Sequence, residues 1–355
     1  MSYPDILYGN IKVPLIFEAL VNTNEMRRLN GISQDVLPSH CVPYPTASRF
    51  EHCLGAFHLA RKVTKSFFIG RRPTTESTRK TKLLQISALL HDAGNPAFSH
   101  VSEPFLRQLC KRDGESFLEE LLTGTESEKI INRLGFGLKE IVRMVTGQAE
   151  PFSAVLNGSI DIDNLDNVAR YWAVSHNAEQ LYNPEFIASC FDFTNSRWTL
   201  NGVCLEEVEK WQAARAAVYG TIYGNPHLNI AMMIYRALGM AFVAGQIKED
   251  FFRLNDYDAL TYLISCKNYD VAALATRVLQ GKWHQEFFFE ETFEPSENFK
   301  CLLKHWDIRC KLADFICQKC GFPKTAICIY LGQGKDKRQI TLQFQTQKGL
   351  QFLAN

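Results

Sequence analysis

The chain has 355 residues, of which 46% are hydrophobic, 22% charged and 12% aromatic. This composition excludes a disordered or fibrous protein and is sufficient for a large core. The 39 Lys and Arg residues nearly balance the 38 Asp and Glu residues, and the net charge of +1 gives no indication of nucleic acid or an anionic membrane as a partner. No window offers the roughly 18 uncharged apolar residues of a membrane-spanning helix.

The eleven cysteines are scattered without a framework spacing, which is typical of reduced thiols. The opening residues, MSYPDILYGN, lack the basic and then apolar pattern of a secretory signal. We therefore expect a cytoplasmic protein with no membrane partner.

Apolar residues recur every three or four positions through most of the chain, which is the period of an amphipathic helix. The pattern predicts helices within residues 16–20, 54–63, 83–90, 104–122, 136–146, 160–175, 205–222, 228–244, 256–265 and 269–281. Residues 70–82 are basic and polar without such a period, so we expect an exposed loop there, or a lid that attracts phosphate.

Near the C-terminus the pattern changes from helix to strand. Residues 326–331 and 339–344 are β-branched, alternating runs on either side of the turn-prone residues 332–337, and they predict a hairpin. We expect a mainly α fold, with a helical domain over residues 1–295 and a small C-terminal α/β lobe over residues 296–355.

The segment LLQISALLHDAGNPAFSHVSE, residues 83–103, carries the most informative polar residues. An apolar helix delivers His91 and Asp92 at its C-terminal end, where the sequence Gly-Asn-Pro stops it. A neutral imidazole and an anionic carboxylate are suitable ligands for a divalent ion. An isolated His-Asp pair also arises by chance, so both interpretations stay open for this motif alone.

Two further clusters flank this motif. Upstream, the segment SRFEHCLG places Arg49 and His52 three residues apart at the start of a helix. Downstream, the segment NGSIDIDNLDNVARYW places Asp163, Asp166 and Arg170 on one helical face. Either cluster alone also fits a solvated polar face.

The order of a histidine, a His-Asp pair and a distant aspartate resembles the HD-domain metal-dependent phosphohydrolases. Within that superfamily the chain is most similar to the deoxynucleoside triphosphate triphosphohydrolases. The segment HDAGNPAFSHVSE resembles the bacterial dGTPase signature HDxGNPPFGHxGE, while SRFEHCLG and NGSIDID resemble RFEHSLG and NGIDVD of the SAM-and-HD-containing dNTPases. The similarity runs from DILYGNIKVP to about Trp283, and it implies an HD-domain helical core.

The resemblance implies one divalent metal ion, Mn²⁺, Mg²⁺ or Fe²⁺. Its implied ligands are His52, His91, Asp92 and Asp163. The choice of Asp163 over Asp161 follows from the family motif. His100 and Glu103 match the catalytic histidine and the acid that orients it, and an imidazole is suited to exchange a proton near neutral pH.

The same resemblance implies substrate contacts at six positions. These are Gln34, Arg49, Asn95, Asp166, Arg170 and Tyr223. For Tyr223 a core aromatic is the open alternative. The family segment DYxxRD lacks its tyrosine and last aspartate here, where Asn167 and Tyr171 stand, and a further family histidine has no counterpart in residues 111–115.

The leading hypothesis is a nucleotide phosphohydrolase that releases a deoxynucleoside and triphosphate from a dNTP. Two alternatives stay open, the first of them because of Asn167 and Tyr171. One is an HD phosphohydrolase for another nucleotide or for a phosphomonoester or diester, and the other is an inactive module that binds nucleotide or nucleic acid. Since the relatives assemble as oligomers, we also expect a homo-oligomer.

Overall fold

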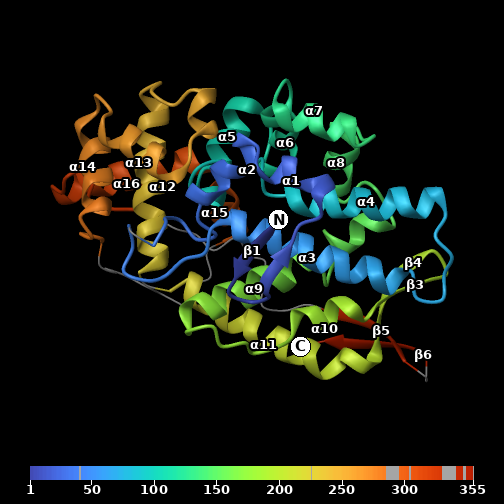
Figure 1. Cartoon of the computed structure of the whole chain (residues 1–355). Coiled ribbons are helices and arrows are strands. Elements are labelled where there is room, and N and C mark those ends of the chain that lie inside the picture. The colour runs from blue at the N-terminus through green and yellow to red at the C-terminus, as the bar shows by residue number, and fades with distance from the viewer. Residues whose placement is uncertain are drawn as a thin grey trace.

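The computed structural model describes residues 1–39, 41–224, 226–284, 296–303, 305–329, 341–346 and 349–354. In these ranges the fold is mainly α, as predicted (Figure 1). The α-helices are α1 Leu15–Val21, α2 Asn24–Arg28, α3 Arg49–Phe67, α4 Thr75–Leu90, α5 Glu103–Cys110, α6 Gly114–Leu122, α7 Glu126–Arg133, α8 Leu138–Val145, α9 Ile162–Ser175, α10 Pro184–Ser189, α11 Leu205–Ile222, α12 His227–Val243, α13 Asp256–Ile264, α14 Tyr269–Leu279, α15 Glu297–Leu303 and α16 Trp306–Cys320. The strands are β1 Ser2–Asp5, β2 Gly9–Lys12, β3 Phe191–Thr194, β4 Arg197–Asn201, β5 Thr341–Thr346 and β6 Gly349–Ala354.

Helix α3 runs through the middle of the molecule and packs against α4 on one side and α9 and α10 on the other (Figure 1). The helix begins sharply because Ser48 and Glu51 form a capping box: the Glu51 amide donates to Ser48 Oγ (3.2 Å), and the Ser48 amide donates to Glu51 Oε2 (2.8 Å). His52, one residue later, is therefore fixed near the start of a buried helix.

The predicted loop over residues 70–82 holds for residues 70–74 and is wrong from Thr75 onward, where α4 begins. Thr74 and Ser77 form a capping box that starts the helix, and the first turns have no apolar period because most of their side chains face solvent. The predicted helix over residues 104–122 is divided into α5 and α6. Lys111 ends α5 with a φ of 59°, and Asp113 caps α6 by accepting from the Ser116 amide (3.0 Å).

The described strands form two sheets. β1 and β2 make an antiparallel hairpin that pairs Ser2 with Lys12 and Asp5 with Gly9. The second sheet has the order β3-β4-β5-β6, in which β5 runs parallel to β4 and antiparallel to β6. Figure 1 shows this sheet beside α10.

The predicted pairing of residues 326–331 with residues 339–344 is wrong. Residues 326–329 are not in a strand, residues 330–340 lie outside the described residues, and β5 pairs with the segment that follows it. The alternating pattern of residues 349–354 fits a strand equally well, so the pattern alone could not choose between the two partners. The domain boundary at residue 295 lies outside the described residues and stays a prediction.

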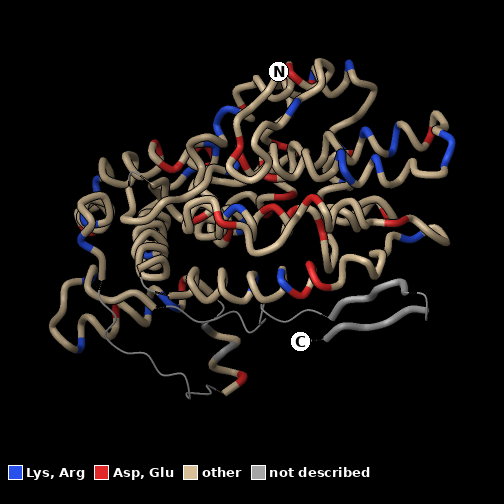
Figure 2. The backbone as a smooth tube through the Cα atoms, turned by 60° about the horizontal axis from the view of Figure 1, so that its bottom comes forward, with Lys and Arg blue, Asp and Glu red and all other residues tan. Residues whose placement is uncertain are grey.

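The remaining helices surround this centre. α11 packs on α9, and α12 packs against α14 and α16 at one end of the molecule (Figure 1). Basic and acidic residues are intermixed along the chain trace (Figure 2), consistent with the near-zero net charge. In the part of the chain that the structure describes, a bilayer-spanning helix is not found.

Candidate metal centre

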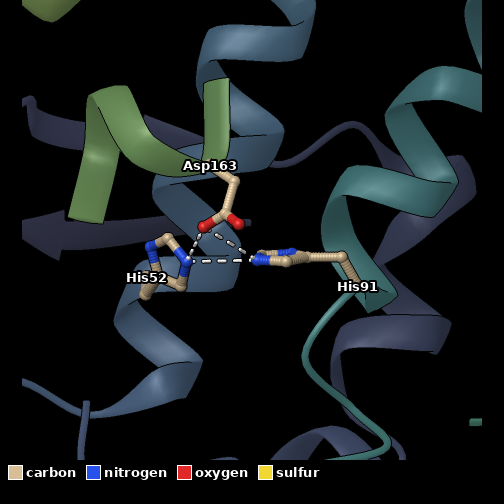
Figure 3. A group of neighbouring side chains, drawn as sticks. All are labelled: His52, His91 and Asp163. Carbon is tan, nitrogen blue, oxygen red and sulfur yellow. Dashed lines mark hydrogen bonds and ion pairs between the residues drawn. The ribbon is translucent and has the colours of Figure 1, made fainter. Parts of the chain in front are cut away.

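Four predicted ligands converge at the junction of α3, the C-terminal end of α4 and α9. His52 Nε2 lies 2.9 Å from Asp163 Oδ1 and 3.1 Å from His91 Nε2, and His91 Nε2 lies 3.5 Å from Asp163 Oδ1 (Figure 3). Asp92 adjoins this group, with its carboxylate oxygens 3.7 Å from His91 Nε2 and 3.8 Å from His52 Nε2. The structure therefore brings together the side chains that the sequence scatters over residues 52–163.

Hydrogen bonds at the other ring nitrogens fix how the two histidines face this point. His91 Nδ1 donates to the Ala88 carbonyl (2.9 Å), and His52 Nδ1 donates to Asp166 Oδ2 (2.7 Å). Because a carbonyl and a carboxylate only accept, both Nδ1 atoms carry the hydrogen and both Nε2 atoms are directed at Asp163. This pattern is typical of metal-binding histidines.

Asp92 is held by two of the predicted substrate-binding residues. Arg49 Nη1 donates to Asp92 Oδ2 (2.5 Å), and Asn95 Nδ2 donates to Asp92 Oδ1 (2.6 Å). Arg49 Nε also donates to Ser99 Oγ (2.8 Å). In this structure Arg49 and Asn95 thus act on a predicted ligand, and both are buried.

The charges of the centre reinforce one another despite their burial. Burial acts to lower the pKa of His91, but the adjacent Asp92 carboxylate raises it well above its usual value. Burial acts to raise the pKa of Asp163, but its hydrogen bonds with His52 and His91 lower it well below its usual value. A cation that binds here would therefore compete with a proton for His91.

Asp161 has a different role from Asp163. It is the N-cap of α9, and its carboxylate accepts from the Asn164 amide (2.7 Å) and from the Gly158 amide (3.0 Å). With its oxygens used to cap the helix, Asp161 leaves Asp163 as the α9 carboxylate that faces the two histidines.

Asp166 and Arg170 lie behind His52. Both side chains are fully buried, and the Arg170 Nε and Nη2 atoms each donate to Asp166 (2.9 Å). Arg170 Nη1 donates to Asp5 Oδ2 (2.8 Å). Each guanidinium nitrogen therefore already donates to a buried carboxylate, and this geometry does not bring Arg170 to an open surface as a phosphate contact.

His100 and Glu103 form the predicted pair at the start of α5. His100 Nδ1 lies 3.0 Å from Glu103 Oε1, and the His100 side chain is 73% exposed. Burial acts to raise the pKa of Glu103, but the hydrogen bond from His100 lowers it. Glu103 therefore stays ionised and orients an imidazole that is open to solvent.

The loop that carries His100 has an unusual backbone. Phe98 and Ser99 have positive φ angles of 60° and 49°, which non-glycine residues rarely adopt. The Phe98 amide donates to Asp256 Oδ1 (2.7 Å), and Ser99 Oγ accepts from Arg49. Such strain occurs where surrounding contacts over-determine the backbone, often at functional sites.

The other two predicted substrate residues lie on different elements. Gln34 Nε2 donates to Asn167 Oδ1 (3.3 Å), while Gln34 Oε1 is buried and has no hydrogen-bond partner among the described residues. Tyr223 follows the last residue of α11, and at 45% exposure it is not a core aromatic. A buried acceptor such as Gln34 Oε1 is suited to receive a hydroxyl of a ligand.

Sequence reasoning missed two residues near the centre. Arg215 on α11 is 7% exposed, and its Nε and Nη1 atoms have no hydrogen-bond partner among the described residues. Its guanidinium lies 4.9 Å from the ring centroid of Tyr219, a residue whose pKa is raised by burial and further by Asp163. No local sequence pattern distinguishes a buried arginine from an exposed one on a helix. The burial of Arg215 therefore follows only from the packing of α11 on α9.

The second missed residue is Glu115, at the start of α6. Burial and the negative charges of Asp113 and Asp163 raise its pKa to about 7. The preceding Gly114 packs closely on the site, since a Cβ there would lie 2.5 Å from Asn95 Oδ1. A larger side chain at position 114 would require the Asn95 side chain to shift away from Asp92.

Comparisons with known proteins agree with this geometry. Residues 49–171 match the family described as HD domain. The chain is 26% identical over 261 residues to an uncharacterized protein of Methanocaldococcus jannaschii, covering 70% of this chain and 52% of that protein. It is 27% identical over 180 residues to the deoxynucleoside triphosphate triphosphohydrolase SAMHD1 homologue of Dictyostelium discoideum, covering 47% of this chain and 35% of that protein.

The chain thus spans about half the length of these relatives or less. Among solved structures, it is similar to a phosphohydrolase of Bacteroides thetaiotaomicron with a TM-score of 0.73 at 18% identity, covering 100% of this chain and 93% of that one. A hypothetical protein of Aquifex aeolicus gives a TM-score of 0.68 at 18% identity, covering 99% and 90%. At this identity the likeness shows the fold alone.

Proposed function

We propose that the chain is a metal-dependent hydrolase of nucleotides, because residues 49–171 match the HD domain family. Its proposed substrate is a deoxynucleoside triphosphate, which it converts to deoxynucleoside and triphosphate. The observation that carries the proposal is the convergence of His52, His91 and Asp163, with Asp92 beside them, from three separate helices.

The donor set fits a divalent ion. Two ligand atoms about 2.1 Å from a common ion and at right angles to each other lie about 3.0 Å apart. The separations of 2.9, 3.1 and 3.5 Å between the histidine and aspartate atoms are close to this value. Two imidazoles and two carboxylates suit Mn²⁺, Fe²⁺ or Mg²⁺ and leave room for water and a phosphate oxygen. When bound, such an ion would polarise the phosphoryl group and lower the pKa of a bound water.

His100 and Glu103 are proposed to carry the proton transfers. Since Glu103 holds Nδ1 of His100, the imidazole Nε2 is the atom that exchanges a proton with water or with the leaving group. Water adds to the α-phosphorus, and the bond from that phosphorus to the 5′-oxygen breaks. The attacking water loses one proton, and the 5′-oxygen of the leaving nucleoside gains one. The reaction therefore consumes one water and needs no other reactant.

Arg215 is the proposed cation for the triphosphate. Its Nε and Nη1 atoms are buried and have no hydrogen-bond partner in the part of the chain that the structure describes, and both could donate to phosphate oxygens. Gln34, whose Oε1 has no partner within the described ranges, is proposed to accept from a sugar hydroxyl.

One observation favours a different nucleotide substrate. Tyr171 replaces the last aspartate of the family segment, and its hydroxyl lies 3.1 Å from His227 Nδ1. His227 Nδ1 in turn lies 2.5 Å from Asp35 Oδ2. A phenol engaged in this way offers the sugar no carboxylate, so a ribonucleotide or another phosphate ester is the second candidate.

The test is a panel of nucleotides and phosphate esters with Mn²⁺, in which the products are identified by anion-exchange chromatography. Release of triphosphate from a dNTP supports the proposal, and turnover of a ribonucleotide or of another phosphate ester in place of a dNTP supports the second candidate. Turnover should be lost in Asp163→Ala and kept in Asp192→Ala, which alters a partly exposed acid of β3 that pairs with Arg71. Full activity of metal-replete Asp163→Ala, or binding without turnover by the wild-type protein under every divalent ion, contradicts the proposal.

A further inference from the structure

We propose that the N-terminal hairpin β1–β2 is a positioning element of the metal centre. Asp5 and Tyr8 on this hairpin hold the Arg170–Asp166 pair, and that pair orients the imidazole of His52. The inference rests on the proposed metal site but concerns residues that do not touch the ion.

The contacts form an unbroken path from the hairpin to His52. Asp5 Oδ2 accepts from Arg170 Nη1 (2.8 Å), and the opposite edge of that guanidinium donates to both oxygens of Asp166 (2.9 Å each). Asp166 Oδ2 then accepts from His52 Nδ1 (2.7 Å). The side chains of Asp5, Asp166, Arg170 and His52 are 2% exposed or less, so water does not screen these interactions.

The hairpin makes a second contact with the same carboxylate. Tyr8 Oη donates to Asp166 Oδ1 (2.8 Å), and the Tyr8 ring lies 5.9 Å from the Arg170 guanidinium carbon. Asp5 Oδ1 also accepts from the Leu7 amide (2.9 Å) and the Tyr8 amide (3.0 Å). One carboxylate therefore shapes the turn that presents Tyr8 and anchors Arg170.

Helix α3 is shaped to receive this pair. Gly55 lies three residues after His52, and a Cβ there would lie 1.8 Å from Asp166 Oδ1 and 2.5 Å from Arg170 Nη2. The glycine thus allows the Asp166 carboxylate to lie against the helix that carries His52. Any larger side chain would push the carboxylate away from the imidazole.

The chemistry of the network favours a role in ligand orientation. Buried ion pairs are costly to desolvate and add little net stability compared with apolar packing. The network keeps the proton on His52 Nδ1. It also places a net negative charge behind the ring, because Asp5 and Asp166 carry two negative charges and Arg170 carries one positive charge. Both effects make Nε2 a better ligand, and disturbing such partners typically weakens metal binding about 10- to 100-fold.

The test compares the Mn²⁺ affinity of full-length variants, measured from the EPR signal of free Mn²⁺. Asp5→Asn keeps the shape of the side chain and should weaken Mn²⁺ binding about tenfold, at the lower end of that range. The matched control is Asp314→Asn, which likewise removes a carboxylate from a buried arginine, Arg236, but in the α12–α16 interface. Its Mn²⁺ affinity should equal that of the wild type.

A second variant and a spectroscopic readout separate positioning from general destabilisation. Tyr8→Phe removes one hydroxyl and should weaken Mn²⁺ binding in the same direction but less, and this variant decides the question if Asp5→Asn does not fold. In pulsed EPR of the Mn²⁺ complex, both variants should show altered coupling to one of the two histidine nitrogens, whereas Asp314→Asn should not. Wild-type affinity and couplings in a folded Asp5→Asn or Tyr8→Phe protein would overturn the inference, while a wild-type protein that binds no Mn²⁺ would instead refute the metal site.

Discussion

Replacing Gly55 with alanine tests the packing between α3 and the carboxylate behind His52. The added Cβ would lie 1.8 Å from Asp166 Oδ1 and 2.5 Å from Arg170 Nη2, far inside van der Waals contact. Asp166 cannot move away without leaving His52 Nδ1 and the Arg170 guanidinium, both of which it contacts within 2.9 Å. The substitution is therefore expected to affect both stability and metal binding.

The magnitude follows from three opposing contributions. Alanine is favoured over glycine in a helix interior by about 1 kcal/mol. Overpacking a core position costs about 1–3 kcal/mol, and separating a buried charge from its partner costs about 3–5 kcal/mol. The free energy of unfolding should thus fall by about 3–7 kcal/mol, a large part of the 5–15 kcal/mol typical of folded proteins.

The assay is urea denaturation followed by circular dichroism, with Mn²⁺ binding measured on the folded protein. The matched control is Gly220→Ala in α11, where a Cβ meets nothing within 4 Å. This control should leave stability unchanged or raise it by up to about 1 kcal/mol. If Gly55→Ala is as stable as Gly220→Ala and binds Mn²⁺ like the wild type, the proposed packing of Asp166 against α3 is refuted.

Three further outcomes follow from the structure. His100→Gln should lower kcat by about 10²–10⁴-fold without changing Mn²⁺ affinity, and a parallel loss of both would contradict a role confined to proton transfer. Removing metal with EDTA should lower the melting temperature, and Mn²⁺ at 100 times its Kd should restore about 2.7 kcal/mol of stability, whereas an unchanged melting curve would argue against a bound ion. Burial raises the pKa of Asp256 to about 7 from its usual 3.8, so its contribution to stability is fully present below pH 3.8 and is lost as the pH rises through 7. Relative to Asp256→Asn, the wild type should lose about 2–3 kcal/mol between pH 5 and 8, and a constant difference between their denaturation midpoints would contradict that pKa.

The sequence was most informative where one face of a helix packs on the core. The predicted ranges 205–222, 228–244 and 256–265 agree with α11, α12 and α13 to within one residue at each end, because apolar and polar residues alternate there with the helical period. The first half of α4 gave no such signal, since a solvated turn needs no apolar face. The strand partner of β5 also depends on tertiary context that an alternating pattern cannot supply.

Candidate ligands could be predicted because their order along the chain is itself a pattern. The roles of Asp166 and Arg170 could not, although they share a helical face with Asp163. They differ from Asp163 because Asp5 and Tyr8, more than 150 residues away in sequence, cover that part of α9. A local pattern indicates which side chains share a helical face. Only the tertiary contacts decide which of those side chains are buried by another segment.

The charges around the centre give a physical reason for a divalent ion. Asp92 and Asp163 border the two imidazoles, Asp166 and Asp5 lie behind them, and Arg49 and Arg170 are the paired cations. With neutral imidazoles, these four carboxylates exceed the two guanidinium groups by two negative charges. Protons on both imidazoles balance that excess, consistent with the raised pKa values of His52 and His91 that their neighbouring carboxylates produce against the effect of burial. A divalent ion balances it equally well while freeing both Nε2 atoms as ligands, so proton release and metal binding should be two sides of one equilibrium.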